Sequence, residues 1–182
     1  MLPTGHLAAG YLTAYGVVKL FYPGLSAEQS NQLLALGTFA GFAPDLDVFW
    51  FFLKHKTLLV ANTESAEDSH RKFFSHAPFY WLLASLVMYA TADGTFGKAA
   101  AIVFWLSSWS HFFLDSIEGG IPWLKPFSGK LYAFSNTESS IVILERNFIW
   151  HSLGFLKVYS RSLSFYFEIL IILAGILVYF RF

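Results

Sequence analysis

Four short polar clusters interrupt an otherwise apolar chain, and their side chains are of the types that bind divalent metals. The clusters are His6, the Pro44-Asp45-Leu46-Asp47 stretch, His70-Arg71 with the following His76, and His111 with Asp115. Imidazole and carboxylate groups are ligands of zinc and similar ions. Because ionisable groups are costly in apolar surroundings, they seldom lie there without a task. The sequence therefore predicts a metal site assembled from distant parts of the chain.

The pairs within these clusters each allow two interpretations. His111 and Asp115 are four residues apart, so a helix places them on one face where they can bind one ion. A hydrogen bond that ties two helices together explains this pair equally well. Asp45 and Asp47 follow a proline in a predicted extended or turn segment, where two close carboxylates repel unless a cation or an arginine lies between them. The alternative is an Asx-type turn that caps the next segment.

The third cluster precedes an apolar run that begins at residue 78. If Ser75 caps a helix there, His76 lies at the positive end of the helix, which favours the neutral imidazole that binds metals. Arg71 can offer paired donors to a phosphate or carboxylate, and an arginine at the membrane surface is an equally good interpretation.

Two further candidates depend on their surroundings. Glu145 lies in an apolar stretch and is a candidate ligand or base, although pairing with Arg146 or with a neighbouring helix explains it almost as well. Taken alone, His6 is typical of a solvated histidine near the N-terminus. It is a candidate ligand because it is predicted to lie on the same side of the membrane as the other clusters.

The composition is that of an integral membrane protein. Of the 182 residues, 55% are hydrophobic, 20% aromatic and 13% charged, whereas a soluble domain is about 25% charged. The aromatic excess suits interfacial belts. The net charge is zero, so no nucleic-acid partner is indicated. There is no cysteine, so nitrogen and oxygen atoms must hold any metal. No basic residue precedes the first apolar run, which argues against a cleaved signal peptide.

Apolar segments predict an all-α, polytopic membrane helical bundle that forms a single domain over residues 1–182. About five transmembrane helices are expected, together with one interfacial helix over residues 141–156. Ser26 is the predicted N-cap of the second transmembrane helix. Residues 54–72 and 118–140 are predicted polar loops. The five apolar segments are residues 7–22, 32–43, 78–92, 99–117 and 163–180.

Threading the chain through these helices brings all four polar clusters to the same membrane face. The same threading places nine basic residues on that face and three on the other. Because basic residues concentrate on the cytoplasmic side, the N-terminus and the site are predicted to be cytoplasmic and the C-terminus external. The nine are Lys54, Lys56, Arg71, Lys72, Lys125, Lys130, Arg146, Lys157 and Arg161, and the three are Lys19, Lys98 and Arg181.

The clusters taken in order resemble the signature of YdjM-type membrane-bound metal-dependent hydrolases. The resemblance continues into Gly120-Ile-Pro-Trp-Leu-Lys-Pro126 and Leu144-Glu145-Arg146, and so spans about residues 5–147. The interval between His70 and His76 is one residue longer than in the usual pattern, and Ala77 replaces the usual serine. More distantly, the chain is similar to zinc-dependent phospholipase C and P1-type nucleases, although their His-x-x-x-Glu pair is not found.

The resemblance implies a metal-dependent hydrolase of the inner membrane. The expected reaction is hydrolysis of an ester, with a phosphoester as the leading candidate, in a lipid or lipid-linked substrate at the cytoplasmic interface. A metal-activated water would attack it. Asp45 or Asp47 is the candidate general base, and Arg71 is expected to bind the phosphate. One or two divalent ions, with zinc expected, would be bound by residues among His6, Asp45, Asp47, His70, His76, His111, Asp115 and Glu145.

Two other functions remain open at this point. A purely structural metal site would be closed by protein ligands, whereas a catalytic site keeps one position open, and the number of candidate ligands does not decide between them. A metal-ion transporter needs polar groups at several membrane depths. The clusters here gather at one face, which favours the hydrolase.

Overall fold

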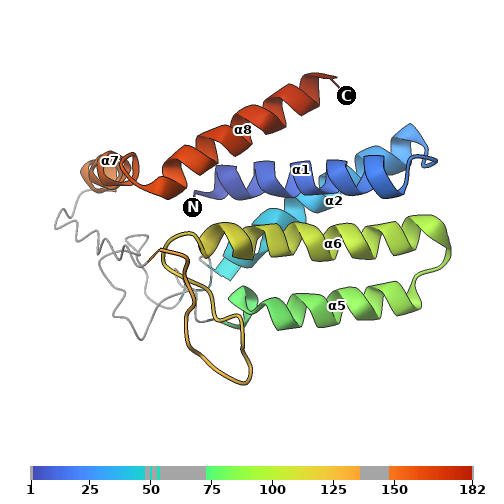
Figure 1. The fold of residues 1–182 in the computed structure, drawn as a ribbon, viewed down its shortest axis with the longest axis horizontal. Helices are drawn as coiled ribbons and strands as arrows, with labels where there is room; N and C mark the ends of the chain where they lie inside the picture. The colour runs from blue at the N-terminus through green and yellow to red at the C-terminus, as the bar shows by residue number, and fades with distance from the viewer. Residues whose placement is uncertain (1, 48–49, 51–52, 54–72, 136–147, 182) are drawn as a thin grey trace.

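Four helices lie side by side in two hairpins, and two further helices follow toward the C-terminus (Figure 1). The computed structural model describes residues 2–47, 50, 53, 73–135 and 148–181. The first hairpin joins α1 (Pro3–Phe21) to α2 (Ala27–Phe42), and the second joins α5 (Pro78–Thr91) to α6 (Gly94–Asp115). Helices α7 (Phe148–Tyr159) and α8 (Leu163–Arg181) complete the described part, which contains no β-strand. The all-helical class is therefore confirmed.

The helix boundaries follow local chemistry. Pro3 opens α1 and Pro78 opens α5, each in the first turn, where proline costs no hydrogen bond. Ser26 caps α2 as predicted, because its hydroxyl accepts from the Gln29 N–H while the Gln29 side chain accepts from the Ser26 N–H. Ser75 was considered as a possible cap of α5, but it does not take this place. The N-cap is Ala77, without a side-chain hydrogen bond.

Glycines allow α1 and α2 to approach closely at their crossing. A methyl group added at Gly10 would lie 2.3 Å from the Gly37 carbonyl oxygen, and one at Gly41 would lie 2.6 Å from the carbonyl oxygen of His6. Gly37 and Gly41 are four residues apart, the small-xxx-small spacing of closely packed membrane helices. Helix α6 covers this pair, and an apolar core forms between the three helices from Ala14, Val17, Val18, Leu33, Leu34, Ala99 and Val103.

The five expected membrane crossings are not confirmed by the length and composition of the described helices. Of the helices that the structure describes, α8 is long and apolar enough to cross a bilayer, with a mean hydropathy of 2.2. Helix α5 is apolar but has 14 residues, or about 21 Å at 1.5 Å per residue, which is less than the bilayer core of about 30 Å. Helices α1, α2 and α6 carry polar and small residues, which they bury against one another. Length and apolar composition therefore support one span and leave five unconfirmed.

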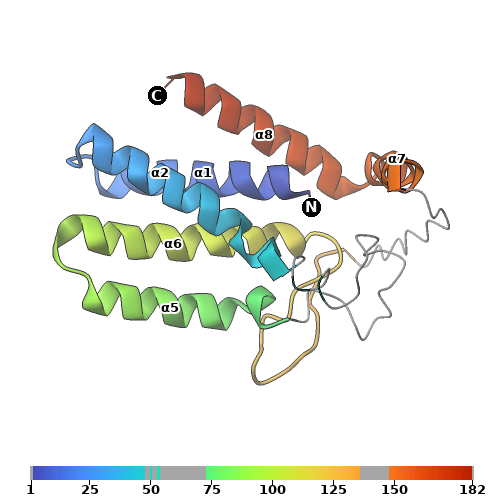
Figure 2. The same ribbon diagram turned by 180° about the vertical axis from the view of Figure 1, so that it is seen from behind.

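One end of the bundle collects the segments that carry the polar clusters. Helix α1 begins there, α2 and α6 end there, and the views from front and back agree (Figures 1 and 2). Two short 3₁₀ helices, η1 (Ala43–Leu46) and η3 (Phe74–His76), lie at the same end. Asp45 lies within η1 and Asp47 directly follows it in helical conformation. The extended alternative is thus wrong and the turn alternative is closer, because Pro44 enters the first turn of a short 3₁₀ helix.

Candidate metal centre

Four side chains from three separate segments meet at this end of the bundle. They are Asp45 from η1, His76 from η3, and His111 and Asp115 from the last turns of α6. One nitrogen or oxygen atom of each lies within 4.8 Å of one such atom of every other. His76 Nε2 and His111 Nε2 lie 3.5 Å and 3.6 Å from Oδ1 of Asp45. His111 Nε2 is also 3.7 Å from Oδ2 of Asp115.

The ring of His111 is oriented by the backbone of α2. Its Nδ1–H donates to the Gly41 carbonyl oxygen at 2.9 Å. That bond fixes the tautomer, so Nε2 carries a lone pair and faces Asp45 and Asp115. The side chain is fully buried, and Nε2 makes no hydrogen bond. A buried nitrogen without a hydrogen-bond partner is costly in a folded protein, and a metal ligand is one explanation.

The ring of His76 is oriented by a carboxylate. Its Nδ1–H donates to Asp47 Oδ2 at 2.8 Å, and the Ser75 hydroxyl donates to the same oxygen at 2.6 Å. A carboxylate that holds the far nitrogen of a histidine is the usual outer support of a metal ligand. Asp47 is therefore not one of the four side chains of the group; it orients the His76 ring through Nδ1.

His6, from α1, lies next to this group of four side chains. Its imidazole stacks on that of His111, with ring centroids 3.8 Å apart. Nε2 lies 3.2 Å from Oδ1 of Asp115 and 3.9 Å from Oδ2 of Asp45. The side chain is fully buried, and neither ring nitrogen makes a hydrogen bond. Two such nitrogens in one buried ring mark a place where a further polar partner fits.

The donor set suits a divalent transition metal. A tetrahedral zinc ion with bonds of about 2.0–2.1 Å separates its ligand atoms by about 3.3 Å. The nitrogen–oxygen separations between the histidines and Asp45 or Asp115 run from 3.2 Å to 3.9 Å. Two carboxylates in this buried space need compensating positive charge, which a divalent cation supplies. The residues present therefore fit a metal ion, with nitrogen and oxygen ligands as the absence of cysteine requires.

The charges of the site shift the pKa values of the two residues that come from the 3₁₀ helices. Burial raises the pKa of Asp45, but the hydrogen bond from His76 and the neighbouring imidazoles outweigh burial and lower this pKa to about 2. Burial lowers the pKa of His76, but hydrogen bonds to Asp45 and Asp47 dominate and raise this pKa to about 9. Without a metal, a proton on His76 thus compensates the carboxylates.

Glu168 of α8 fixes the beginning of α1. Its buried carboxylate accepts from the Leu2 N–H at 3.2 Å, the Gly5 N–H at 3.1 Å and the Thr4 hydroxyl at 2.7 Å. It also accepts from the Tyr159 hydroxyl. The first N–H groups of a helix lack partners within the helix, so this carboxylate satisfies them and complements the positive end. Because His6 follows Gly5 directly, Glu168 also fixes where His6 enters the site.

The sequence-predicted candidates divide into three groups. Asp45, His76, His111 and Asp115 come together, and His6 lies in contact with them. Asp47 lies beside the group and bonds to His76. His70, Arg71 and Glu145 lie outside the described residues.

Sequence reasoning missed three contributors. Glu168 was visible as a lone charge in an apolar helix, which is a signal of a task but not of which one. The Gly37-x-x-x-Gly41 spacing was visible too and pointed to close helix packing. Ser75 carried no signal for its bond to Asp47, because the two residues are 28 positions apart.

Comparison with known proteins places the chain in a family. No curated protein and no solved structure matches it, so the remote similarity to phospholipase C and P1-type nucleases gains no support. The model of the family described as YdjM inner membrane protein matches residues 1–182. Because this match covers the whole sequence, the chain belongs to the YdjM inner membrane protein family.

Proposed function

We propose that this protein is a membrane-bound, metal-dependent hydrolase that acts on an ester, in the first place a phosphoester, of a lipid or lipid-linked substrate. The observation that carries the proposal is the convergence of two imidazole Nε2 atoms and two carboxylates from η1, η3 and α6 in one buried group. Both imidazoles are held through Nδ1, one by Asp47 and one by a backbone carbonyl. Such preorganisation is typical of metal sites that do chemistry.

Each side chain of the group has a role in this proposal. His76, His111 and Asp115 would hold the ion, and Asp45 would lie on its outer side, since the Asp45 side chain is 12% exposed against 0–3% for the others. Such an ion would lower the pKa of a coordinated water toward neutrality and would polarise the substrate oxygen. Asp45 is then the group placed to accept a proton, because it is the more exposed of the two carboxylates in the group. His6 can complete the first coordination shell or help to hold a second ion.

The membrane setting suggests the substrate. Membership of an inner membrane protein family and the apolar α8 support a location in the bilayer. In the proposed topology the chain crosses the membrane several times, with the N-terminus and the metal centre on the cytoplasmic side. A site at that end of the helices meets the head-group region, where the ester bonds of lipids lie. Arg71 belongs to the proposal as the phosphate-binding residue.

The proposal is tested with the purified protein in detergent micelles. Wild type and the variants His111→Ala and Asp115→Ala are stripped with a chelator, reloaded with Zn²⁺ or Mn²⁺, and assayed for bound metal and for turnover of phosphomonoester, phosphodiester and carboxylester substrates. We expect metal-dependent turnover in wild type and loss of both metal and turnover in the two variants. Asp93→Asn, which removes an exposed acid at the opposite end of α6, is the matched control. Turnover that survives in Asp115→Ala defeats the proposal.

A second candidate function is a structural metal site, and the burial of the histidine side chains favours it. The side chains of all three histidines of the site are 0% exposed, as in sites that protein ligands close completely. In that case metal removal lowers the unfolding temperature, while no substrate is turned over with or without the ion. The same assay, run beside thermal unfolding, separates the two functions.

A further inference from the structure

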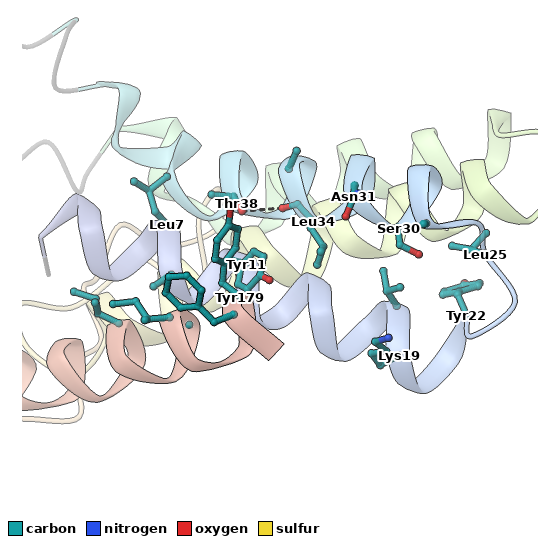
Figure 3. A pocket seen from close by; sticks show the side chains of 18 of the residues that line it. Leu7, Tyr11, Lys19, Tyr22, Leu25, Ser30, Asn31, Leu34, Thr38 and Tyr179 are labelled. Carbon is teal, nitrogen blue, oxygen red and sulfur yellow. Dashed lines mark hydrogen bonds between the residues drawn. The ribbon is translucent and has the colours of Figure 1, made fainter. Parts of the chain in front are cut away.

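A large groove lies between α8 and the α1–α2 hairpin, on a different face of α1 from His6. Its volume is about 1230 Å³, above the 300–1,000 Å³ that is usual for small-molecule pockets. Figure 3 shows Leu7, Tyr11 and Tyr179 toward one end and Lys19, Ser30 and Asn31 toward the other. The groove is therefore elongated, with an apolar part and a polar end.

The walls of the groove are mainly hydrocarbon. Leu7, Leu34, Ile172 and Ile176 line it, with tyrosine rings along its length. Helix α8 provides one wall, and the same helix is the candidate membrane span, with 17% of its apolar window buried. A groove with such a wall opens to the acyl chains of the bilayer. Along α1, the 12 residues from Leu7 to Lys19 cover about 18 Å, which exceeds the hydrocarbon thickness of one leaflet, about 15 Å.

The polar end carries positive charge. Lys19, in the last turn of α1, is the one charged side chain among the residues that line the groove in the described part of the chain. Ser30 and Asn31 lie close by on α2 and offer hydrogen bonds. Glu28, in the first turn of α2, is not among the lining residues. This end therefore complements an anionic head group.

From these observations we propose that the groove binds one anionic phospholipid, with its head group at Lys19 and an acyl chain along α8. In the topology proposed above, on which this step rests, the lipid comes from the leaflet opposite the metal centre, because Lys19 is 13 residues or about 20 Å along α1 from His6. It is thus a bound lipid distinct from the substrate of the proposed hydrolase. Its binding does not depend on the metal or on catalysis.

The test is native mass spectrometry of the full chain, released from detergent micelles that contain dioleoyl phosphatidylglycerol or dioleoyl phosphatidylcholine. The two lipids share their acyl chains and differ in head-group charge. We expect wild type to retain one phosphatidylglycerol with an affinity about fivefold higher than for phosphatidylcholine, the effect of one basic residue at a membrane surface. Lys19→Gln should remove this preference, while weaker binding of both lipids persists.

Two further variants make the test specific. Lys98→Gln removes an exposed basic residue from the beginning of α6, which does not line the groove, and should leave the preference intact. Ala35→Trp places a large side chain at an exposed lining position and should reduce retention of both lipids. Equal retention of the two lipids by wild type, an equal effect of Lys98→Gln, or undiminished binding in Ala35→Trp overturns the proposal. A lipid-free dimer that Ala35→Trp abolishes also overturns it, because a second copy then fills the groove.

Discussion

Asp47 and His76 form a directed pair, in which the carboxylate holds Nδ1 of the ring at 2.8 Å and turns Nε2 toward Asp45, 3.5 Å away. The two residues are 29 positions apart in the chain, and the pair links the residue that follows η1 to the last residue of η3. It therefore fixes both the tautomer and the rotation of one candidate ligand. The consequences can be measured without knowing the substrate.

We expect Asp47→Ala to weaken metal binding by about 10–100-fold while leaving the number of bound ions unchanged, because an outer support is lost and no ligand is. Competition with a chromogenic chelator measures the affinity, and elemental analysis measures the stoichiometry. Ser75→Ala removes the second donor to the same Asp47 oxygen, and we expect it to weaken metal binding less than Asp47→Ala does. Complete loss of metal in Asp47→Ala would show instead that this carboxylate is itself a ligand.

Metal affinity should rise with pH up to about 9. The carboxylates of Asp45 and Asp47 raise the pKa of His76 to about 9, so at pH 7 the metal-free site holds a proton that the ion must displace. The apparent association constant is then expected to increase about tenfold per pH unit and to level off above pH 9. Asp45, with a pKa of about 2, stays ionised and contributes nothing in this range. Calorimetry in buffers of different ionisation enthalpy should show about one proton released per ion at pH 7.

The same pKa shift predicts how the metal-free protein responds to pH. A histidine whose pKa is higher in the folded than in the unfolded state stabilises the fold when protonated. For His76 this contribution is fully present below the unfolded value of 6.5 and is lost as the pH rises through about 9. The unfolding temperature of stripped protein should therefore fall across this interval, and saturating metal should reduce the fall. A flat profile for the stripped protein would contradict the assigned protonation.

Glu168→Ala should destabilise the protein and weaken metal binding together. The substitution removes the acceptor of the Leu2 N–H and of the Thr4 hydroxyl, while the Gly5 N–H keeps only its second acceptor, the Leu2 carbonyl oxygen; we expect a cost of about 1–3 kcal/mol. Thermal unfolding should show a decrease of roughly 2–12 °C for a chain of this size. Glu28→Gln is the matched control, because it removes an exposed acid from the first turn of α2. If the stability falls but the metal affinity is unchanged, Glu168 does not position His6.

Two glycines of α1 should respond in opposite ways to alanine. In Gly10→Ala the new methyl group meets the Gly37 carbonyl oxygen at 2.3 Å, so the helices must separate, and we expect a loss of about 1–3 kcal/mol. In Gly16→Ala the methyl group meets nothing within 4 Å, and the higher helix propensity of alanine should add up to about 1 kcal/mol. Chemical unfolding in detergent measures both. Equal effects of the two substitutions would show that close packing of α1 on α2 is not required.

Much of the helical framework could be predicted from the sequence, because long apolar runs mark helices. Helix α8 begins and ends within one residue of the predicted segment, and α5 does so too. Helix α1 was expected from residue 7 and begins at Pro3. The difference arises because Thr4, Gly5 and His6 are small or polar yet lie inside the helix, where Glu168 and the site satisfy them.

Threading the chain through the predicted helices was enough to infer that the polar clusters meet at one end of the bundle. It did not show which side chain of each cluster faces the centre of the site. Nothing in the spacing of Asp45 and Asp47 tells which one faces the centre, since a 3₁₀ helix and an extended segment direct the two side chains differently. The four donors to Glu168 include two backbone N–H groups. Every residue except proline has such a group, so the sequence does not show which of them donate to Glu168. Long-range contacts of this kind need coordinates.

The bond from His111 to the Gly41 carbonyl has a consequence for how the protein should be probed. Substituting polar residues one by one would identify His111 but not its partner Gly41, because a side-chain substitution does not remove a main-chain oxygen. Only a change that displaces the α2 backbone can disturb this contact. In a saturation screen for function, Gly10, Gly37 and Gly41 should therefore tolerate as few replacements as the candidate ligands.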